Sequence, residues 1–244
     1  MSAAAAKAVF VLVHGAWHGG WCWRHVAPIL RSAGHEVFAP SLTGMGDRAH
    51  LANPGVDLEL HITDVVTLLE MHDLKEVVLL GHSYGGMVVT GAADRAASRI
   101  RRLIYFDAFV PQNGKPQMDY IAAAVAERAA GFRKQGEASG FIDPPPNSLW
   151  GHTDPGLIEW IRPREVKHPY RTMTQPLRLA NEAALERIPK TFVHCTAPAT
   201  GAFDQFAARY RNDPAWHFHE LKSGHDAMIL QPRAVADILL KESN

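Results

Sequence analysis

A serine in a tight, glycine-flanked turn is the residue of this chain best suited to do chemistry. Residues 81–85 read GHSYG, a G-x-S-x-G pattern centred on Ser83. The pattern follows the apolar residues 77–80 and opens the small-residue stretch 87–97, so a strand passes into a helix there. Such a turn projects the serine hydroxyl at the end of a sheet, ready for nucleophilic attack. An incidental serine in a glycine-rich turn is the simpler alternative.

A serine nucleophile needs a base, and His225 is placed to supply it. It lies between the strand-like residues 216–221 and a final helical pattern, where a loop can bring an imidazole over the serine. The prediction rests on the position of His225 in the chain, because 14 histidines are present and the residue type alone singles out none of them. We expect His217 and His219 to be ordinary sheet residues and His82 to pack or hydrogen-bond locally.

Two aspartates, Asp107 and Asp204, are candidates for the acid that orients His225. Asp107 ends the apolar residues 103–106 and follows the strand after the serine, which makes it the favoured acid. Asp204 follows a later strand, but a helix has begun by that point. Asp226 adjoins His225 in sequence and cannot easily reach its Nδ1 atom. Asp204, no acid at all, and a purely structural Asp107 stay open as alternatives.

The oxyanion that forms during acyl transfer needs two backbone N–H donors. The residue after the nucleophile, Tyr84, is expected to supply one. The loop after the first strand, residues 14–17 (HGAW), is expected to supply the other through Ala16. Gly15 would let that loop approach the serine closely.

The elements that must position these residues alternate along the chain. Strands are predicted at residues 8–13, 36–39, 77–80, 103–106, 191–195 and 216–221, with helical patterns between them. This alternation is typical of an α/β fold with a mostly parallel central sheet flanked by helices. Residues 112–186 break the rhythm, so we expect a helical cap inserted after the fourth strand. The core would then comprise residues 1–111 and 187–244.

Composition narrows the function. Lys plus Arg equals Asp plus Glu, 25 each, which disfavours nucleic acid and anionic membranes as partners. The two cysteines, Cys22 and Cys195, form no disulfide framework or metal-binding spacing. The N-terminal run MSAAAAK lacks the parts of a signal peptide. We expect a cytoplasmic monomer or homodimer with a small-molecule substrate, no cofactor and no metal.

The motifs together resemble a known group. Residues 14–23 (HGAWHGGWCW), residues 81–86 (GHSYGG) and Gly224-His225 are similar to the plant methylesterase and hydroxynitrile lyase branch of the α/β-hydrolases and its bacterial relatives. The resemblance covers essentially the whole chain and implies the α/β-hydrolase fold. It also implies either cleavage of small, often aromatic methyl esters or cleavage of cyanohydrins.

Two departures from the lyase pattern favour the esterase. Lyases of this group carry a threonine at the position of Gly15 and a lysine at the position of Asp226. A carboxylate beside departing cyanide would repel it. The group also places its acid where this chain has residues 195–202, which contain no carboxylate. Because the acid is missing from the family's usual position, Asp107 is favoured only by its place at the end of a predicted strand.

We therefore predict a serine esterase that hydrolyses small aromatic or hydrophobic carboxylic esters by a Ser-His-Asp acyl-enzyme mechanism. A carbamate or activated-amide hydrolase is the alternative, and a hydroxynitrile lyase or a non-catalytic small-ligand receptor is less favoured. A haloalkane dehalogenase is excluded because its nucleophile is an aspartate. The substrate pocket is predicted to be lined by Trp17, His14, Trp150 and Trp160.

Overall fold

The structure is a computed structural model that describes residues 7–243. Residues 1–6 lie outside the described residues, and so does most of the N-terminal run in which we expect no signal peptide. Within residues 7–243, no helix is both long and apolar enough to cross a bilayer.

A six-stranded parallel sheet forms the centre of the molecule, with strand order β2-β1-β3-β4-β7-β8. The strands are β1 (Val9–Val13), β2 (Glu36–Phe38), β3 (Val77–His82), β4 (Ile100–Phe106), β7 (Lys190–Cys195) and β8 (Trp216–Leu221). Each predicted strand is present, and β4 begins earlier than predicted, at Ile100. The predicted parallel α/β architecture is confirmed.

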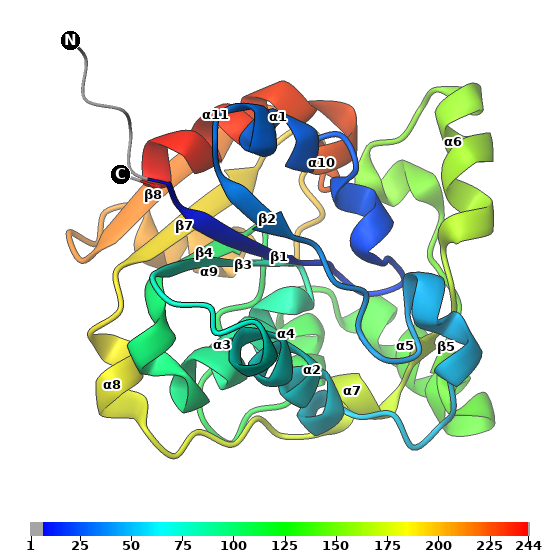
Figure 1. Ribbon diagram of the computed structural model, residues 1–244. Coiled ribbons are helices and arrows are strands. Elements are labelled where there is room, and N and C mark those ends of the chain that lie inside the picture. The colour runs from blue at the N-terminus through cyan, green and yellow to red at the C-terminus, as the bar shows by residue number, and fades with distance from the viewer. Residues whose placement is uncertain (1–6, 244) are drawn as a thin grey trace, which may run out of the picture.

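Helices lie on both sides of the sheet (Figure 1). Successive side chains of a strand point alternately into two hydrophobic cores, one on each face of the sheet. In β3, Val77 and Leu79 face one core, whereas Val78 and Leu80 face the other. This period of two buries every residue of the central strand β3, because the sheet is covered on both faces there. The edge strand β8 has no fully buried residue. The sheet is thereby a rigid base for the loops at its carboxyl ends.

Helices cover both faces of the sheet. On one face lie α2 (Leu58–Met71), α3 (Gly85–Arg95) and α9 (Asp204–Tyr210), and on the other lie α1 (Ala27–Ser32), α10 (Ala227–Leu230) and α11 (Pro232–Glu242). Short 3₁₀ turns complete the connections: η1 (Gly20–Trp23), η2 (Gly46–Leu51), η3 (Ala97–Arg99), η4 (Asn147–Trp150) and η5 (Arg162–Arg164).

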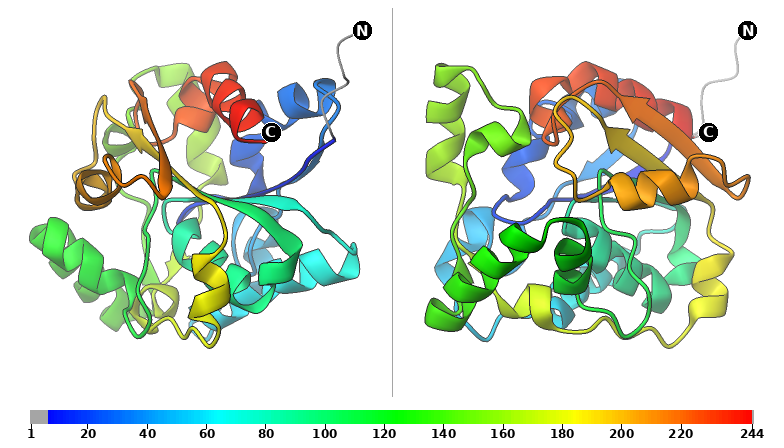
Figure 2. Two further views of the ribbon diagram at one scale, coloured as in Figure 1. Left: turned by 90° about the vertical axis from the view of Figure 1, so that its left-hand side faces the viewer. Right: turned by 180° about the vertical axis from the view of Figure 1, so that it is seen from behind.

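The segment between β4 and β7 adds no strand to the central sheet. It contains α4 (Gln117–Ala124), α5 (Ala126–Ser139), α6 (Pro155–Ile161), α7 (Arg171–Thr174) and α8 (Glu182–Glu186). It also contains a short antiparallel pair that the sequence did not indicate, β5 (Phe141–Ile142) and β6 (His168–Pro169). Helices α5, α6 and α7 gather at the end of the molecule where the strands terminate (Figures 1 and 2). There they can shape a site above the sheet.

Candidate active site

Ser83 lies at the sharp turn between β3 and α3. Its backbone has φ of +55°, a left-handed conformation that costs a non-glycine residue about 1–3 kcal/mol. Two hydrogen bonds hold the turn, since the N–H groups of Gly86 and Phe109 donate to the Ser83 carbonyl oxygen at 3.1 and 3.2 Å. A strained serine fixed in this way has the conformation that a nucleophile elbow requires.

Asp107 and His225 form a buried pair, although 118 positions separate them in the chain. The Nδ1 atom of His225 lies 2.6 Å from Oδ2 of Asp107. The second oxygen of Asp107 accepts a hydrogen bond from the Cys195 N–H at 3.1 Å. Asp107 also has positive φ, +43°, which turns its side chain from the end of β4 toward the loop after β8. The favoured acid is thus in place to orient the predicted base.

Asp204, the alternative acid, lies elsewhere. It is the first residue of α9, its side chain is mostly exposed, and its Oδ1 atom lies 3.0 Å from Nε2 of His194. Among the described residues, Asp107 is the aspartate whose carboxylate hydrogen-bonds His225.

The His225 imidazole is packed between aromatic rings. Phe203 stacks on it with 5.0 Å between ring centroids, and Trp150 lies 5.0 Å away at a tilt. Burial lowers the pKa of His225 to about 3, with Asp226 acting in the opposite direction. The ring is therefore neutral at physiological pH, which is the form that can accept a proton from serine.

The predicted oxyanion donors lie on the two loops that meet at Ser83. A Cβ atom at Gly15 would lie only 2.8 Å from Cβ of Ser83, so the loop after β1 approaches the serine more closely than a side chain would allow. Neither the Ala16 nor the Tyr84 N–H donates to another group within residues 7–243. Both amides are thus free for an oxyanion.

The side chain of Tyr84 points away from the site. Its hydroxyl lies 2.8 Å from Nδ1 of His61 on α2, and the Nε2–H of His61 donates to the Thr43 carbonyl oxygen at 2.8 Å. Burial raises the pKa of Tyr84 well above its usual value, so the phenol stays neutral. Only the backbone of Tyr84 is available for catalysis.

A small cavity of about 30 Å³ adjoins Ser83. Trp17, Trp150 and Ala16 line it, together with residues that the sequence did not single out: Phe109, Gln117, Ile121, Arg128, Phe132, Met173, Thr200, Ala202 and Phe203. Most of this lining is aromatic or aliphatic. The cavity is suited to a flat, apolar group.

Two predicted pocket residues, His14 and Trp160, do not line this cavity. His14 is buried beneath the loop, where its Nε2 atom accepts a hydrogen bond from the Leu42 N–H at 3.0 Å. Burial lowers its pKa to about 3, so it is a neutral structural group. Trp160 lies on α6 beneath the guanidinium of Arg164, 4.3 Å from its ring centroid. Their residue types resembled pocket residues, but the fold directs them elsewhere.

A buried group of histidines surrounds Asp226, next to the catalytic candidate. Its Oδ2 atom accepts hydrogen bonds from Nε2 of His18 at 3.0 Å and of His152 at 2.7 Å. Burial opposes the charge of Asp226, but His18 and His152 hold its pKa well below the usual range. Sequence reasoning missed this group because its members come from three distant segments.

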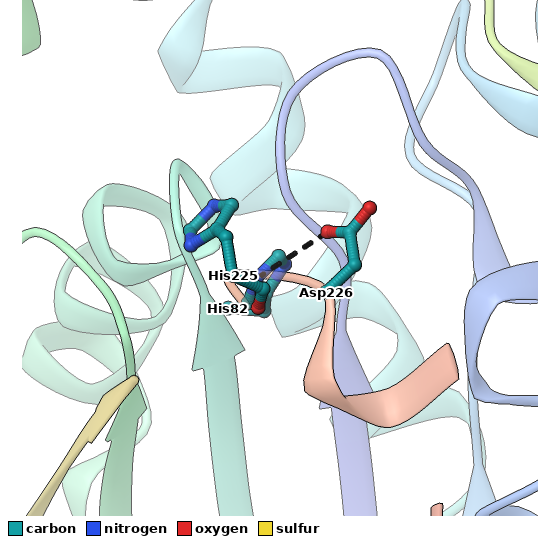
Figure 3. A group of neighbouring side chains, drawn as sticks. All are labelled: His82, His225 and Asp226. Atoms are coloured by element: carbon teal, nitrogen blue, oxygen red, sulfur yellow. Dashed lines mark hydrogen bonds and ion pairs between the residues drawn. The ribbon is translucent and has the colours of Figure 1, made fainter. Parts of the chain in front are cut away.

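His82, His225 and Asp226 also place possible metal-ligand atoms within 4.8 Å of one another (Figure 3). One ligand atom of each residue already has a partner. Nδ1 of His225 bonds Asp107, Nε2 of His82 lies 3.1 Å from the His225 carbonyl oxygen, and Oδ2 of Asp226 bonds two histidines. Nδ1 of His82 and Oδ1 of Asp226 have no hydrogen-bond partner within residues 7–243.

Comparison with known proteins agrees with this arrangement. The family model described as "Alpha/beta hydrolase family" matches residues 10–238, which is nearly the whole chain. The chain belongs to the alpha/beta hydrolase family. The resemblance drawn from the sequence motifs is thereby confirmed.

Among its relatives is the carbendazim hydrolyzing esterase of Nocardioides sp. (strain SG-4G), 40% identical over 94% of this chain and 97% of that protein. The alpha-hydroxynitrile lyase of Arabidopsis thaliana is 40% identical over 42% of this chain and 40% of its own length. Methylesterases of the same plant match over similar stretches.

Among solved structures, an extracellular alpha/beta-hydrolase from a Paenibacillus species superposes with a TM-score of 0.83 at 25% identity, covering 96% of this chain and 98% of that one. The matched fold, the esterase relatives and the arrangement around Ser83 agree. This chain is an esterase-like alpha/beta hydrolase enzyme.

Proposed function

We propose that this protein is a serine esterase that hydrolyses small aromatic or hydrophobic methyl esters. The observation that carries the proposal is the buried His225–Asp107 pair at 2.6 Å, in a structure whose Ser83 occupies a strained strand-to-helix turn. That combination supports a nucleophile, a base and an orienting acid in the chain order that this family uses.

The reaction proceeds in two steps. In the first, His225 Nε2 takes the proton of Ser83 while Oγ bonds to the ester carbonyl carbon, and the N–H groups of Ala16 and Tyr84 stabilise the oxyanion. The carbon–alkoxide bond then breaks, and His225 gives its proton to the departing alcohol. In the second, His225 takes a proton from water, whose oxygen attacks the acyl-enzyme carbonyl carbon. The bond between that carbon and Ser83 Oγ then breaks, His225 returns its proton to Oγ, and the carboxylic acid is released.

The cavity supports an aromatic acyl group. Trp17, Phe132, Trp150 and Phe203 line the space next to Ser83. Their rings would stack on a flat substrate and exclude water from the acyl-enzyme, as small-molecule sites generally do.

A methyl carbamate is the second candidate substrate. The relative that matches over 97% of its own length is named a carbendazim hydrolyzing esterase, so members of this family act on substrates other than methyl carboxylates. The carbonyl attack is unchanged, so the same residues would serve. Relative rates on matched esters and carbamates distinguish the two.

The structure changes the reason for disfavouring a lyase. The Asp226 carboxylate does not line the cavity, because it is turned toward His18 and His152. Repulsion of cyanide at close range is therefore not the obstacle. The remaining argument is that position 226 offers no lysine, while Gly15 offers no hydroxyl.

A hydrolysis panel tests the proposal. Methyl benzoate, phenyl acetate, an aryl methyl carbamate and mandelonitrile are assayed with the wild type and with Ser83→Ala. We expect ester hydrolysis that is lost in Ser83→Ala, and labelling of Ser83 by a fluorophosphonate. Benzaldehyde release from mandelonitrile would support the lyase, and an unlabelled Ser83 would support a non-catalytic receptor.

We also propose a cytoplasmic location and a monomer or homodimer. The buried Cys22 and Cys195, both free thiols, support a reducing compartment. Cell fractionation and light scattering test the two parts.

A further inference from the structure

An arginine contributes to the cavity next to Ser83. Arg128 comes from α5, and its Nη2 atom donates a hydrogen bond to the Thr200 carbonyl oxygen at 3.2 Å. No carboxylate within residues 7–243 forms an ion pair with it, and none of the residues that line the cavity is acidic. The positive charge of Arg128 is therefore not neutralised within the described protein.

This charge acts on the catalytic centre. Burial is the main cause that lowers the pKa of His225, and the charge of Arg128 lowers it further. Burial also lowers the pKa of Arg128 itself. A half-buried cation among aromatic side chains loses hydration, and an anion bound beside it would restore that loss.

Gln117 is a second polar group in the same cavity. Its side chain is 2% exposed, yet its Oε1 atom has no hydrogen-bond partner. Buried amides are almost always hydrogen-bonded, so an unpaired one at a ligand cavity indicates a missing partner. Rotation of the amide lets Gln117 offer either a donor or an acceptor to a ligand.

From these two residues we propose that the enzyme hydrolyses esters whose acyl part carries an anionic group in addition to the ester. Arg128 would bind that group, Gln117 would hydrogen-bond it or a neighbouring substituent, and the aromatic walls would hold the ring between it and the ester. The substrate class is then the half-esters of aromatic dicarboxylic acids. This inference rests on the proposed esterase activity of the same site.

A structural role for Arg128 makes a different prediction. Its bond to Thr200 joins α5 to the loop that carries Phe203, the ring stacked on His225. If the arginine only held this loop, its loss would slow the hydrolysis of neutral and anionic esters equally. If Arg128 binds the anionic group of the substrate, its removal slows hydrolysis of the anionic ester much more than hydrolysis of the neutral ester.

The test compares methyl benzoate with the monomethyl esters of phthalic, isophthalic and terephthalic acid. The three isomers place the free carboxylate at different distances from the ester, so the preferred isomer indicates the distance between the ester at Ser83 and the anionic group at Arg128. Wild type, Arg128→Gln and Arg128→Lys are assayed, with Arg133→Gln as the matched control, because Arg133 lies exposed on the same helix outside the cavity.

We expect wild type to prefer one half-ester over methyl benzoate. Arg128→Gln should lower kcat/KM for that half-ester by about 10- to 100-fold and for methyl benzoate by less than about 3-fold. Arg128→Lys should retain part of the preference, and Arg133→Gln all of it. Absence of any half-ester preference in wild type, or equal losses on both substrates in Arg128→Gln, would overturn the inference.

Binding separates this inference from the esterase proposal. Calorimetry on Ser83→Ala compares benzoate with the dianion of the preferred isomer, or with all three if wild type hydrolyses no ester. Tighter binding of a dianion that disappears in Ser83→Ala/Arg128→Gln supports the anion site even if the esterase proposal fails. Equal binding of benzoate and every dianion contradicts the site whatever the activity.

Discussion

At the scale of single residues, backbone strain gathers around the predicted chemistry. Five non-glycine residues between positions 7 and 243 have positive φ, and three of them, Trp17, Ser83 and Asp107, belong to the candidate site. Each strained conformation is held by surrounding hydrogen bonds or close packing, as the carbonyl of Ser83 illustrates. The strain lowers the stability of the fold, but it fixes the orientation of these side chains and amides before substrate binds.

Asp107→Asn should lower kcat by about 10³- to 10⁴-fold while the protein stays folded. The amide oxygen would accept the Cys195 N–H and the amide NH₂ would face Nδ1 of His225, which favours the wrong imidazole tautomer and removes the negative charge. Steady-state kinetics and thermal melting measure the two effects. Asp204→Asn is the control and should change kcat by less than about 3-fold. Full activity of Asp107→Asn would remove Asp107 from the proposed mechanism.

Gly15→Ala should lower kcat/KM by about 100-fold, since the added Cβ would lie 2.8 Å from Cβ of Ser83 and displace the oxyanion loop. The rate of fluorophosphonate labelling reports the same displacement directly. Gly131→Ala is the matched control, because a Cβ there meets nothing within 4 Å. Unchanged labelling of Gly15→Ala would mean that the loop tolerates a side chain.

At the scale of elements, an ion pair joins the loop after β1 to the loop after β8. His18 donates from Nδ1 to the Ala16 carbonyl oxygen at 2.8 Å and from Nε2 to Asp226 at 3.0 Å. Both partners are acceptors, so His18 must be doubly protonated. Burial opposes this charge, but Asp226 raises the pKa of His18 to about 9.

The pair should make activity and stability sensitive to alkaline pH. Because the folded pKa of His18 lies above its unfolded value of about 6.5, the stabilisation is complete below that pH and is lost as pH rises through about 9. Thermal melts and kcat/KM from pH 6 to 10 follow the loss. His18→Gln should be less active at pH 7 and lack this alkaline transition, whereas a transition identical to that of wild type would assign it to another group.

The elements were more predictable than their side-chain networks. Periodicity located the six strands, because alternation of apolar residues is a local property of the chain. The position of Asp107 at a strand end likewise indicated where its carboxylate would lie, and its catalytic role stays a prediction. His18 and Asp226 are 208 positions apart, and no local pattern signals that they meet. Arg128 carries no motif, so only the folded cavity singles it out.

At the scale of the whole molecule, the C-terminal helix is fastened to the sheet by one carboxylate. Glu242 at the end of α11 accepts hydrogen bonds from Thr191 on β7 and from His217 and His219 on β8. Arg102 on β4 lies 3.0 Å from the same carboxylate. One side chain thus joins the last helix to three neighbouring strands.

Glu242→Gln should therefore lower the free energy of unfolding by about 1–3 kcal/mol at pH 7. Burial opposes ionisation, yet these hydrogen bonds and Arg102 lower the pKa of Glu242 to about 2, so the stabilisation is present above pH 4.5 and is lost as pH falls toward 2. Urea unfolding at several pH values tests this. Asp237→Asn, in an exposed pair on the same helix, should change stability by less than about 0.5 kcal/mol. A pH-independent deficit in Glu242→Gln would contradict the assignment.

The cavity beside Ser83 has a kinetic consequence. Most of its wall is made of large side chains, among them Trp150 and Phe132. Any substrate that reaches Ser83 must pass these rings, and any product must pass them again on leaving. The rings that select the substrate therefore also affect the rates of entry and release, so enlarging the cavity should speed both while loosening selectivity.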